Sequence, residues 1–432
     1  MKLTVSDERV IVRGIRPEEG LWGPYQFPHP YRLKDRIAVA VHVTEDDIKS
    51  FGNPNRWFES FDNGETWQET DPSIAAECGL CLPNGDRIYF PQENGISVAD
   101  HVFHGWNERT PGSDPKERAE EGHLPIPDGM TAWMDGTRIW AYNADRLPLG
   151  LANKSWKMMR IPAGKTEVLE ENVPIDWPKL TRVVFQGPGY DFIMKPIFPR
   201  GDPKIGPDGA IWMTAYSGEG HIDPSNGQYT PYYSAELFRS TDNGHSFYQH
   251  AHMEYPADGK AYPYQSGGFS DSDIAFMDDG SMLWFMRSCW FASTGYEWAP
   301  MYVSRSEDGG RTWSKPEAFS WTGILPRVVR LADGISLICY ARPGMFIRAS
   351  EDPSGKEWGP EIELMTPGDR SDLANVKADP VKFHDWDGAC NNPELLVIDA
   401  HSALIFYVDF YYPDEEGIAR KTVLCKKITT EK

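Results

Sequence analysis

One histidine of the chain has a setting that suits proton transfer. His29 lies between two prolines in the stretch QFPHP, and Gln26 precedes it at the entrance of an apolar segment. Proline restricts the backbone on both sides of the ring, and an imidazole titrates near neutral pH. We therefore predict that His29 acts as an acid or base and that Gln26 binds the substrate beside it. The alternative is a loop histidine that only hydrogen-bonds a carbonyl group.

Three arginines border apolar segments in a way that suits an acidic ligand. Arg287 in WFMRSCW and Arg342 in CYARPG each close the second of two apolar segments, and Arg327 follows a Leu-Pro pair in GILPRVV. A guanidinium presents a rigid fork that matches a carboxylate. We predict all three as substrate-binding residues. The alternative is a salt bridge to one of the 64 acidic side chains of the chain.

Two further stretches carry side chains for sugar recognition or acid–base chemistry. GACNNPELL places Asn392 and Glu394 at the entrance of the last apolar segment, where an amide can bind sugar hydroxyls and a carboxylate can serve catalysis. Turn-forming asparagines are the alternative. Tyr264 in AYPYQSGG supplies a phenol that can act as an acid or base, or a ring that stacks on a sugar or packs in the core. We predict Glu394 and Tyr264 as catalytic and Asn392 as substrate-binding.

These residues border the strands of a repeated hairpin. An apolar strand, a polar turn and a second, aromatic-rich strand recur along the chain, and helical periodicity is nearly absent. The seven occurrences begin at Tyr31, Gly79, Thr131, Ile205, Ile274, Val328 and Leu395. One hairpin cannot bury both of its faces, whereas several stacked around an axis can. We predict an all-β, seven-bladed β-propeller formed by residues 1–432 as a single domain, in which the N-terminal strand closes the ring onto the last blade.

A second repeat has a structural explanation. The phrase SFDNGETW begins at Ser60, SEDGGRTW begins at Ser306, and variants begin at Ser240 and Ser350. The aspartate can accept hydrogen bonds from N–H groups of the turn, glycine supplies a left-handed conformation, and the aromatic ring packs between neighbouring sheets. A catalytic carboxylate is not needed four times, so we predict that these aspartates hold outer hairpins together.

The bulk composition excludes several classes of partner. A net charge of −21 argues against binding to nucleic acid or to an anionic membrane, and no apolar run is long enough to span a bilayer. Six scattered cysteines form neither a disulfide framework nor a paired metal site, so we expect no metal and no cofactor. The first ten residues contain no secretion signal, which predicts a cytoplasmic protein, or a secreted one if the sequence is truncated.

The four aspartate turns and the hairpins resemble the sialidase-like superfamily of Asp-box (BNR repeat) β-propellers. The resemblance covers most of the chain and implies the fold, with a six-bladed sialidase-type propeller as the alternative to seven blades. True sialidases carry an Arg-Ile-Pro phrase in the first blade, and here Gln26, Phe27 and Pro28 stand in its place. The chain therefore looks closer to seven-bladed members of the superfamily that act on rhamnose and uronates than to true sialidases.

The resemblance implies a carbohydrate-active enzyme. We expect an exo-acting glycoside hydrolase that cleaves a glycosidic bond next to an acidic sugar, in an oligosaccharide or glycoconjugate. One alternative is a lyase that uses a His/Tyr pair on a uronate, because arginine or amide groups, a base and a phenol would serve elimination as well. The other is a propeller that binds glycans without catalysis.

Overall fold

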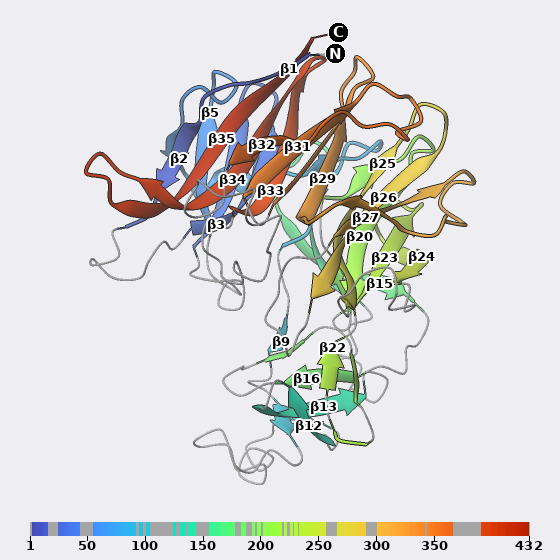
Figure 1. Cartoon of the computed structure of the whole chain (residues 1–432). Coiled ribbons are helices and arrows are strands. Elements are labelled where there is room, and N and C mark those ends of the chain that lie inside the picture. The colour runs from blue at the N-terminus through green and yellow to red at the C-terminus, as the bar shows by residue number, and fades with distance from the viewer. Residues whose placement is uncertain are drawn as a thin grey trace.

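The protein is described by a computed structural model and is almost entirely built of β-strands (Figure 1). The structure describes residues 2–15, 25–43, 55–91, 95–97, 101–103, 124–126, 130–134, 137–143, 155–177, 183–186, 192–194, 197–199, 202–217, 220–222, 225–227, 229–231, 233–255, 266–290, 300–341, 344–365 and 390–431. The statements below concern these residues.

Three sheets have the simple four-stranded order of a propeller blade, with each strand antiparallel to the next. Blade 1 consists of β3 (Tyr25–Arg32), β4 (Ile37–Val43), β5 (Asn55–Ser60) and β6 (Gln68–Thr70). Blade 4 consists of β25 (Ser266–Phe276), β26 (Met282–Trp290), β27 (Met301–Ser306) and β28 (Glu317–Ser320). Blade 5 consists of β29 (Ile324–Arg330), β30 (Ser336–Ala341), β31 (Met345–Ser350) and β32 (Ile362–Met365).

Two further blades are joined through their outer strands. Blade 2 consists of β7 (Leu80–Cys81), β8 (Arg87–Tyr89), β14 (Ser155–Ile161) and β15 (Leu169–Asp176), and the 3-10 helix η2 (Pro72–Glu77) precedes it. Blade 3 consists of an innermost strand in two pieces, β18 (Ile197–Pro199) and β19 (Lys204–Ile205), then β20 (Ile211–Ser217), β23 (Ser234–Ser240) and β24 (Phe247–Glu254). A short parallel pairing of β15 with β24 merges the two blades into one sheet.

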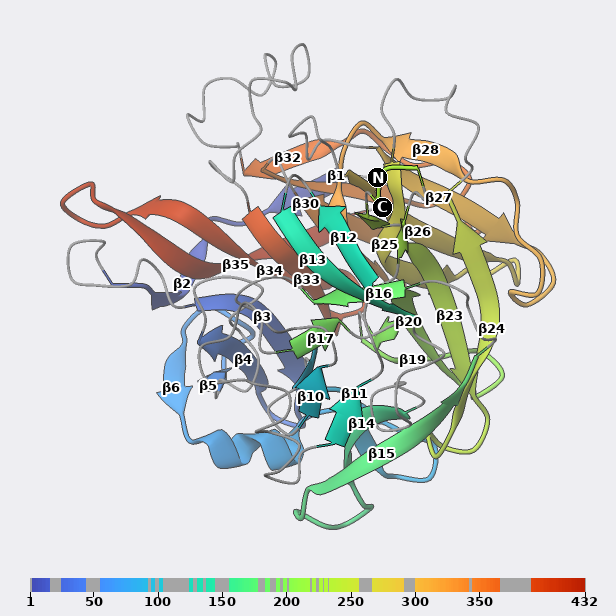
Figure 2. The same cartoon turned by 90° about the horizontal axis from the view of Figure 1, so that it is seen from below.

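The two ends of the chain meet in blade 6. β33 (Cys390–Asp399), β34 (Ser402–Pro413) and β35 (Ala419–Glu431) are completed by β1 (Lys2–Val5) and β2 (Arg9–Arg13), which both pair with β35. This pairing joins the two ends of the chain in one sheet and covers the edge that β35 would otherwise present. Figure 2 shows the blades arranged around an axis.

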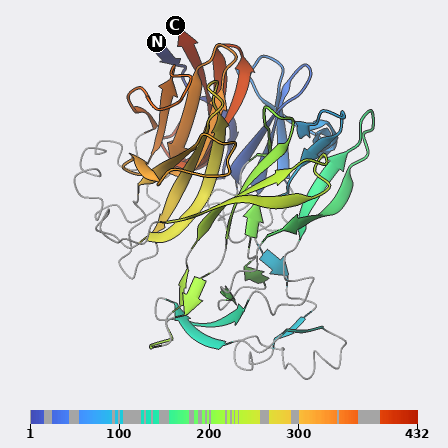
Figure 3. The ribbon, with the colours of Figure 1, turned by 90° about the vertical axis from the view of Figure 1, so that its right-hand side faces the viewer.

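The predicted seventh blade is not confirmed. The hairpin that begins at Thr131 forms β12 (Met130–Met134) and β13 (Thr137–Asn143), which pair with β16 (Val183–Gln186), β21 (Gly220–Ile222) and β22 (Tyr229–Pro231). Two small strand pairs accompany this sheet: β9 (Gly95–Ser97) with β17 (Phe192–Met194), and β10 (His101–Phe103) with β11 (Leu124–Ile126). Figures 1 and 3 show β12, β13 and β16 at one end of the molecule, outside the ring. The described strands form six sheets of the blade type, and this separate sheet is not one of them.

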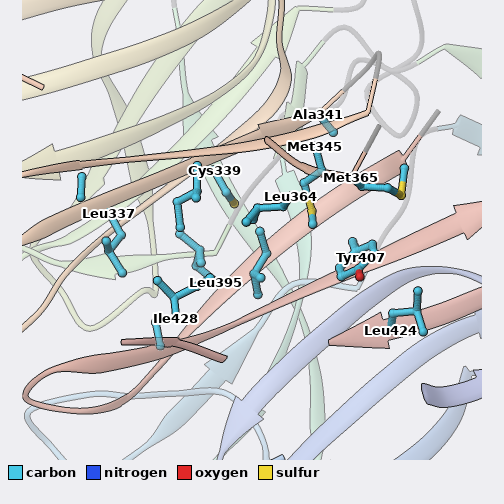
Figure 4. Close-up of a cluster of buried hydrophobic side chains, with 14 of the residues drawn as sticks. Leu337, Cys339, Ala341, Met345, Leu364, Met365, Leu395, Tyr407, Leu424 and Ile428 are labelled. Atoms are coloured by element: carbon cyan, nitrogen blue, oxygen red, sulfur yellow. The ribbon is translucent and has the colours of Figure 1, made fainter. Parts of the chain in front are cut away.

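The apolar core lies between the blades. β30 is buried along its whole length, as a strand covered on both faces must be. Its residues Leu337 and Cys339 pack against Leu395, Tyr407 and Ile428 of blade 6 (Figure 4). Similar clusters fill the spaces between blades 6 and 1, 3 and 4, and 4 and 5. Each blade thus stabilises its neighbours, and the innermost strands are held close to the axis.

The four aspartate turns join the outer two strands of blades 1, 3, 4 and 5. In the first, Asp62 Oδ1 accepts hydrogen bonds from Ser60 Oγ at 2.8 Å and Thr66 N at 2.9 Å. Trp67 Nε1 donates to Gly64 O at 3.1 Å, and Gly64 has the left-handed φ of 92°. The carboxylates in the other three turns also accept backbone N–H bonds. Burial raises the pKa of Asp62, but hydrogen bonds from Thr66 and Ser60 outweigh this effect and hold the pKa at about 2, so the carboxylate is engaged in the turn.

A lysine cross-links three innermost strands near the axis. Lys204 Nζ on β19 donates to Asp273 Oδ2 at 2.7 Å and to the carbonyl oxygens of Ile274 and Val328 at 2.8 Å. Asp273 is almost fully buried, and it also accepts from Val328 N at 2.9 Å. A buried carboxylate needs such partners, because an unpaired charge in an interior without water lowers the stability of the fold.

Replacing this lysine is therefore expected to weaken the ring. Lys204→Met removes the cation and leaves Asp273 buried without it, which should lower the free energy of unfolding by roughly 3 kcal/mol. Urea denaturation measures this. Lys2→Met is the matched control, because Lys2 forms an exposed pair with Glu431 and its loss should change little. An equal effect of both replacements would contradict the assigned role of Lys204.

Candidate active site

The innermost strands place polar side chains at one shared register position. In blade 1 the hairpin turn opens at Leu33, whose N–H bonds to Arg36 O, and equivalent bonds open the turns at Leu82, Gly206, Met277 and Leu331. The residues four positions earlier are His29, Cys78, Asp202, Asp273 and Arg327 in blades 1 to 5. Three of these residues, His29, Asp202 and Arg327, line the same cavity.

Three of the six blades share a further local signature at this position. Phe27, Leu325 and Asn392 have φ of 50°, 45° and 58°, and each is followed by a proline. In each case the strand pairing shifts by a bulge at this point. The residues that follow the prolines are His29, Arg327 and Glu394. The signature therefore places Glu394 as the blade 6 counterpart of the other two.

A cavity of about 320 Å³ lies at the axial position and extends toward blade 2. His29, Asp202, Arg327, Asn392 and Glu394 line it, and apolar and aromatic residues of blades 1 and 2 form much of the remaining wall. Ligand pockets of proteins combine an apolar wall with a few converging polar groups, and they have volumes of this order. The cavity is thus the candidate site that the described residues support best.

Arg327 and Glu394 form a buried ion pair in this cavity. Arg327 Nε donates to Glu394 Oε2 at 2.7 Å, and the side chains are 8% and 6% exposed. Burial by itself lowers the pKa of Arg327, but Glu394, Asp273 and Asp202 raise it, so the guanidinium stays charged. Burial raises the pKa of Glu394, and Asp202 raises it further against the lowering effect of Arg327. Glu394 is therefore the member of the pair that can take up a proton.

His29 and Asp202 form the more open part of the site. His29 Nδ1 lies 3.6 Å from Asp202 Oδ1, which is too long for a hydrogen bond, and the Asp202 side chain is half exposed. The ring of His29 stacks on Tyr31, whose pKa is raised well above its ordinary value by burial and by Asp202. Cys78, at the same register position in blade 2, is buried, and burial raises the pKa of its thiol to about 12. The polar chemistry of this side rests on His29 and Asp202.

The remaining predicted site residues have varied outcomes. Arg287 lies on β26, where its Nη1 donates to Asp271 Oδ2 at 3.0 Å, and it does not line the cavity. Gln26 belongs to β3, but its side chain is outside the described residues, as are the whole of Tyr264 and Arg342. The structure thus brings together His29, Arg327, Asn392 and Glu394 of the predicted set.

Asp202 is a site residue that sequence reasoning missed. It follows the first piece of a broken innermost strand and precedes Pro203, so no hairpin phrase marks it. The signal that could have found it is its distance from the turn: it stands four residues before Gly206, as His29 stands before Leu33.

The described residues contain no cluster of His, Cys, Asp and Glu that could hold a metal ion. Two carboxylates (Asp202 and Glu394), two arginines (Arg32 and Arg327) and one imidazole (His29) are among the residues that line the cavity. The helix within the described ranges is too short to cross a membrane.

Comparison with known proteins shows the fold and leaves the family open. No family model matches the chain, and no curated protein matches it. Among solved structures, a protein of unknown function from Dyadobacter fermentans has 16% identity and a TM-score of 0.56, covering 99% of both chains. The NanB sialidase of Streptococcus pneumoniae has 11% identity and a TM-score of 0.50, covering 98% of this chain and 70% of that one. An α-L-arabinanase of Penicillium chrysogenum has 12% identity and a TM-score of 0.46, covering 98% of both.

At such low sequence identity, the similarity to these solved structures shows the fold alone. The chain is an all-β protein with the β-propeller fold.

The buried ion pair yields a prediction about stability. Arg327→Met would leave Glu394 buried without its cation, and the free energy of unfolding should fall by roughly 3–5 kcal/mol. Adding Glu394→Leu in the same chain should restore most of the loss, because no unpaired charge then remains. Chemical denaturation of the two single variants and the double variant measures the coupling. Additive effects of the two replacements would contradict a coupled pair.

Proposed function

We propose that the protein is an exo-acting glycoside hydrolase whose catalytic carboxyl groups are Glu394 and Asp202. The observation that carries the proposal is their placement. Asp202 of blade 3 and Glu394 of blade 6 line the same cavity and come from two different blades. Hydrolysis of a glycoside uses two carboxyl groups on opposite sides of the bond that is cleaved.

The environments of the two carboxyl groups support different roles. Glu394 is buried and has a raised pKa, which suits the acid that protonates the leaving oxygen. Its Oε2 accepts from Arg327 Nε, and this bond orients the group so that Oε1 can deliver the proton. Asp202 is more exposed, which suits a base or nucleophile. The bond between the anomeric carbon and the leaving oxygen breaks, that oxygen takes the proton from Glu394, and water supplies the new bond to carbon, directly or after attack by Asp202.

The size of the cavity supports action on the end of a glycan. About 320 Å³ is at the small end of the range for ligand pockets, which fits one terminal sugar better than a length of polymer. The acidic-sugar part of the prediction gains no support from Arg287, because that residue pairs with Asp271 and does not line the cavity. The fold shared with the NanB sialidase is consistent with glycan chemistry.

The second candidate function is elimination from a uronate. His29 lines the cavity, its Nδ1 makes no hydrogen bond within the described residues, and an imidazole can remove a proton beside a carboxylate. Incubation with sialosides, arabinosides, rhamnosyl-glucuronates and ulvan fragments separates the two reactions. Hydrolysis releases reducing sugar without ultraviolet absorbance, whereas elimination leaves an unsaturated uronate that absorbs. The absence of either product from the folded protein would favour a glycan-binding propeller.

Removal of either carboxyl group should abolish most of the activity. Glu394→Gln and Asp202→Asn keep the shapes of the side chains but remove proton transfer, so kcat should fall by roughly 10²–10⁴-fold. The matched control is Glu363→Gln on β32, where the side chain is exposed on an outer strand. Initial rates on the best substrate of the panel measure the effect. Near-normal rates for both site variants would overturn the assignment.

The raised pKa of Glu394 predicts the alkaline side of the pH profile. The acid must be protonated to act, so kcat/KM should fall as the pH rises through its pKa, which burial raises above the ordinary value for glutamate. Arg327 lowers this pKa, so Arg327→Met should move the alkaline limb to higher pH. A limb that stays in place in Arg327→Met would show that another group controls it.

A further inference from the structure

The amide of Asn392 is a buried donor that lacks a hydrogen-bond partner. Asn392 is 4% exposed and lines the axial cavity, and its Nδ2 makes no hydrogen bond within the described residues. An unpaired buried donor destabilises a protein, and natural structures contain few of them. A ligand that offers an oxygen at this place would satisfy the donor.

The backbone at Asn392 also indicates a residue retained for its side chain. Its φ of 58° is left-handed, and it precedes Pro393, which restricts it further. Phe27 and Leu325 have the same conformation at the equivalent positions of blades 1 and 5, and both are apolar. Strained residues of this kind cluster at ligand sites. Of the three equivalent residues, Asn392 is the one that can bind a polar group.

We propose that Asn392 binds a hydroxyl group of the sugar in the cavity by donating a hydrogen bond from Nδ2 to the hydroxyl oxygen. The inference rests on the proposed function and deepens it by assigning the chemistry of one subsite. A hydroxyl can accept from Asn392 and at the same time donate to a carboxylate. Glu394 is two residues from Asn392 in the sequence, and Asp202 lies close enough to Glu394 to raise its pKa. A substrate carboxylate at this subsite would be repelled by the carboxylate of Asp202, so its place lies elsewhere.

The test uses Asn392→Gly with Asn243→Gly as the matched control. Glycine accepts the left-handed conformation, so Asn392→Gly removes the amide without adding backbone strain. Asn243 has the same conformation, with φ of 59°, but lies exposed in the aspartate turn of blade 3. The probes are D-glucose, D-galactose, L-arabinose and L-rhamnose, with D-glucuronate and D-galacturonate, and the monodeoxy forms of whichever sugar binds best. Titration calorimetry and thermal unfolding of the full chain give the affinities and the Tm.

The expected result has two parts. Asn392→Gly should weaken binding of the best sugar by roughly tenfold or more, while its Tm without ligand stays within a few degrees of the parent protein, because the donor had no partner. One monodeoxy sugar, which lacks the hydroxyl that Asn392 binds, should also bind the parent protein roughly tenfold more weakly than the full sugar does. Asn392→Gly should bind that monodeoxy sugar and the full sugar with equal affinity. Asn243→Gly should leave affinity unchanged.

Three outcomes would overturn the inference. Unchanged affinity in Asn392→Gly would show that the amide does not contact the sugar, and the proposed hydrolase would stand. A large drop in Tm without ligand would show that Asn392 has a structural partner. The absence of binding by every sugar to the parent protein would overturn this inference together with the proposed function.

Discussion

The interior near the axis excludes water, and this constraint governs which charges the innermost strands can carry. At the shared register position, Asp273 is fully engaged by Lys204 and by the N–H of Val328. Arg327 and Glu394 pair with each other in a similarly buried setting. On the other side, Asp202 and His29 approach each other without a hydrogen bond and remain partly exposed. The charged groups on one side of the ring are thus buried and paired, whereas His29 and Asp202 on the other side are more exposed.

Within this chain the outer turns of the blades are similar, whereas the residue at the register position of His29 on the innermost strands differs between blades. The aspartate turns of blades 1, 3 and 4 use the same hydrogen bonds, and in blade 5 Asp352 also accepts from backbone N–H groups of its turn, because each turn must close an outer hairpin. The inner position carries a different side chain in nearly every blade, since hairpin pairing there depends on the backbone alone. A repeated fold can therefore assemble a site of mixed chemistry, because each blade contributes one side chain to a common centre.

The sequence predicted the parts of the structure that depend on local pattern. Alternating apolar strands, turn residues and the aspartate phrases predicted an all-β propeller, and His29, Arg327, Asn392 and Glu394 do line one cavity. The hairpin at Thr131 has the same local pattern as a blade hairpin, yet it pairs with β16 in a separate sheet, because strand pairing depends on contacts distant in sequence. Asp202 was missed for the same reason. Its strand is interrupted, so only the register of the folded sheet aligns it with His29.

The left-handed residues before the prolines connect the fold to the chemistry. Each one shifts the pairing of its innermost strand, and the next-but-one residue then lies at the position of His29, Arg327 or Glu394. Glycine would adopt this conformation with less strain, but it would leave the wall of the cavity open at these points. Phe27 and Leu325 are almost completely buried and contribute apolar side chains to the wall of the cavity. Asn392 is the third residue with this backbone conformation, and its side chain is polar. The same conformation therefore places apolar side chains at two points of the cavity wall and a hydrogen-bond donor at the third.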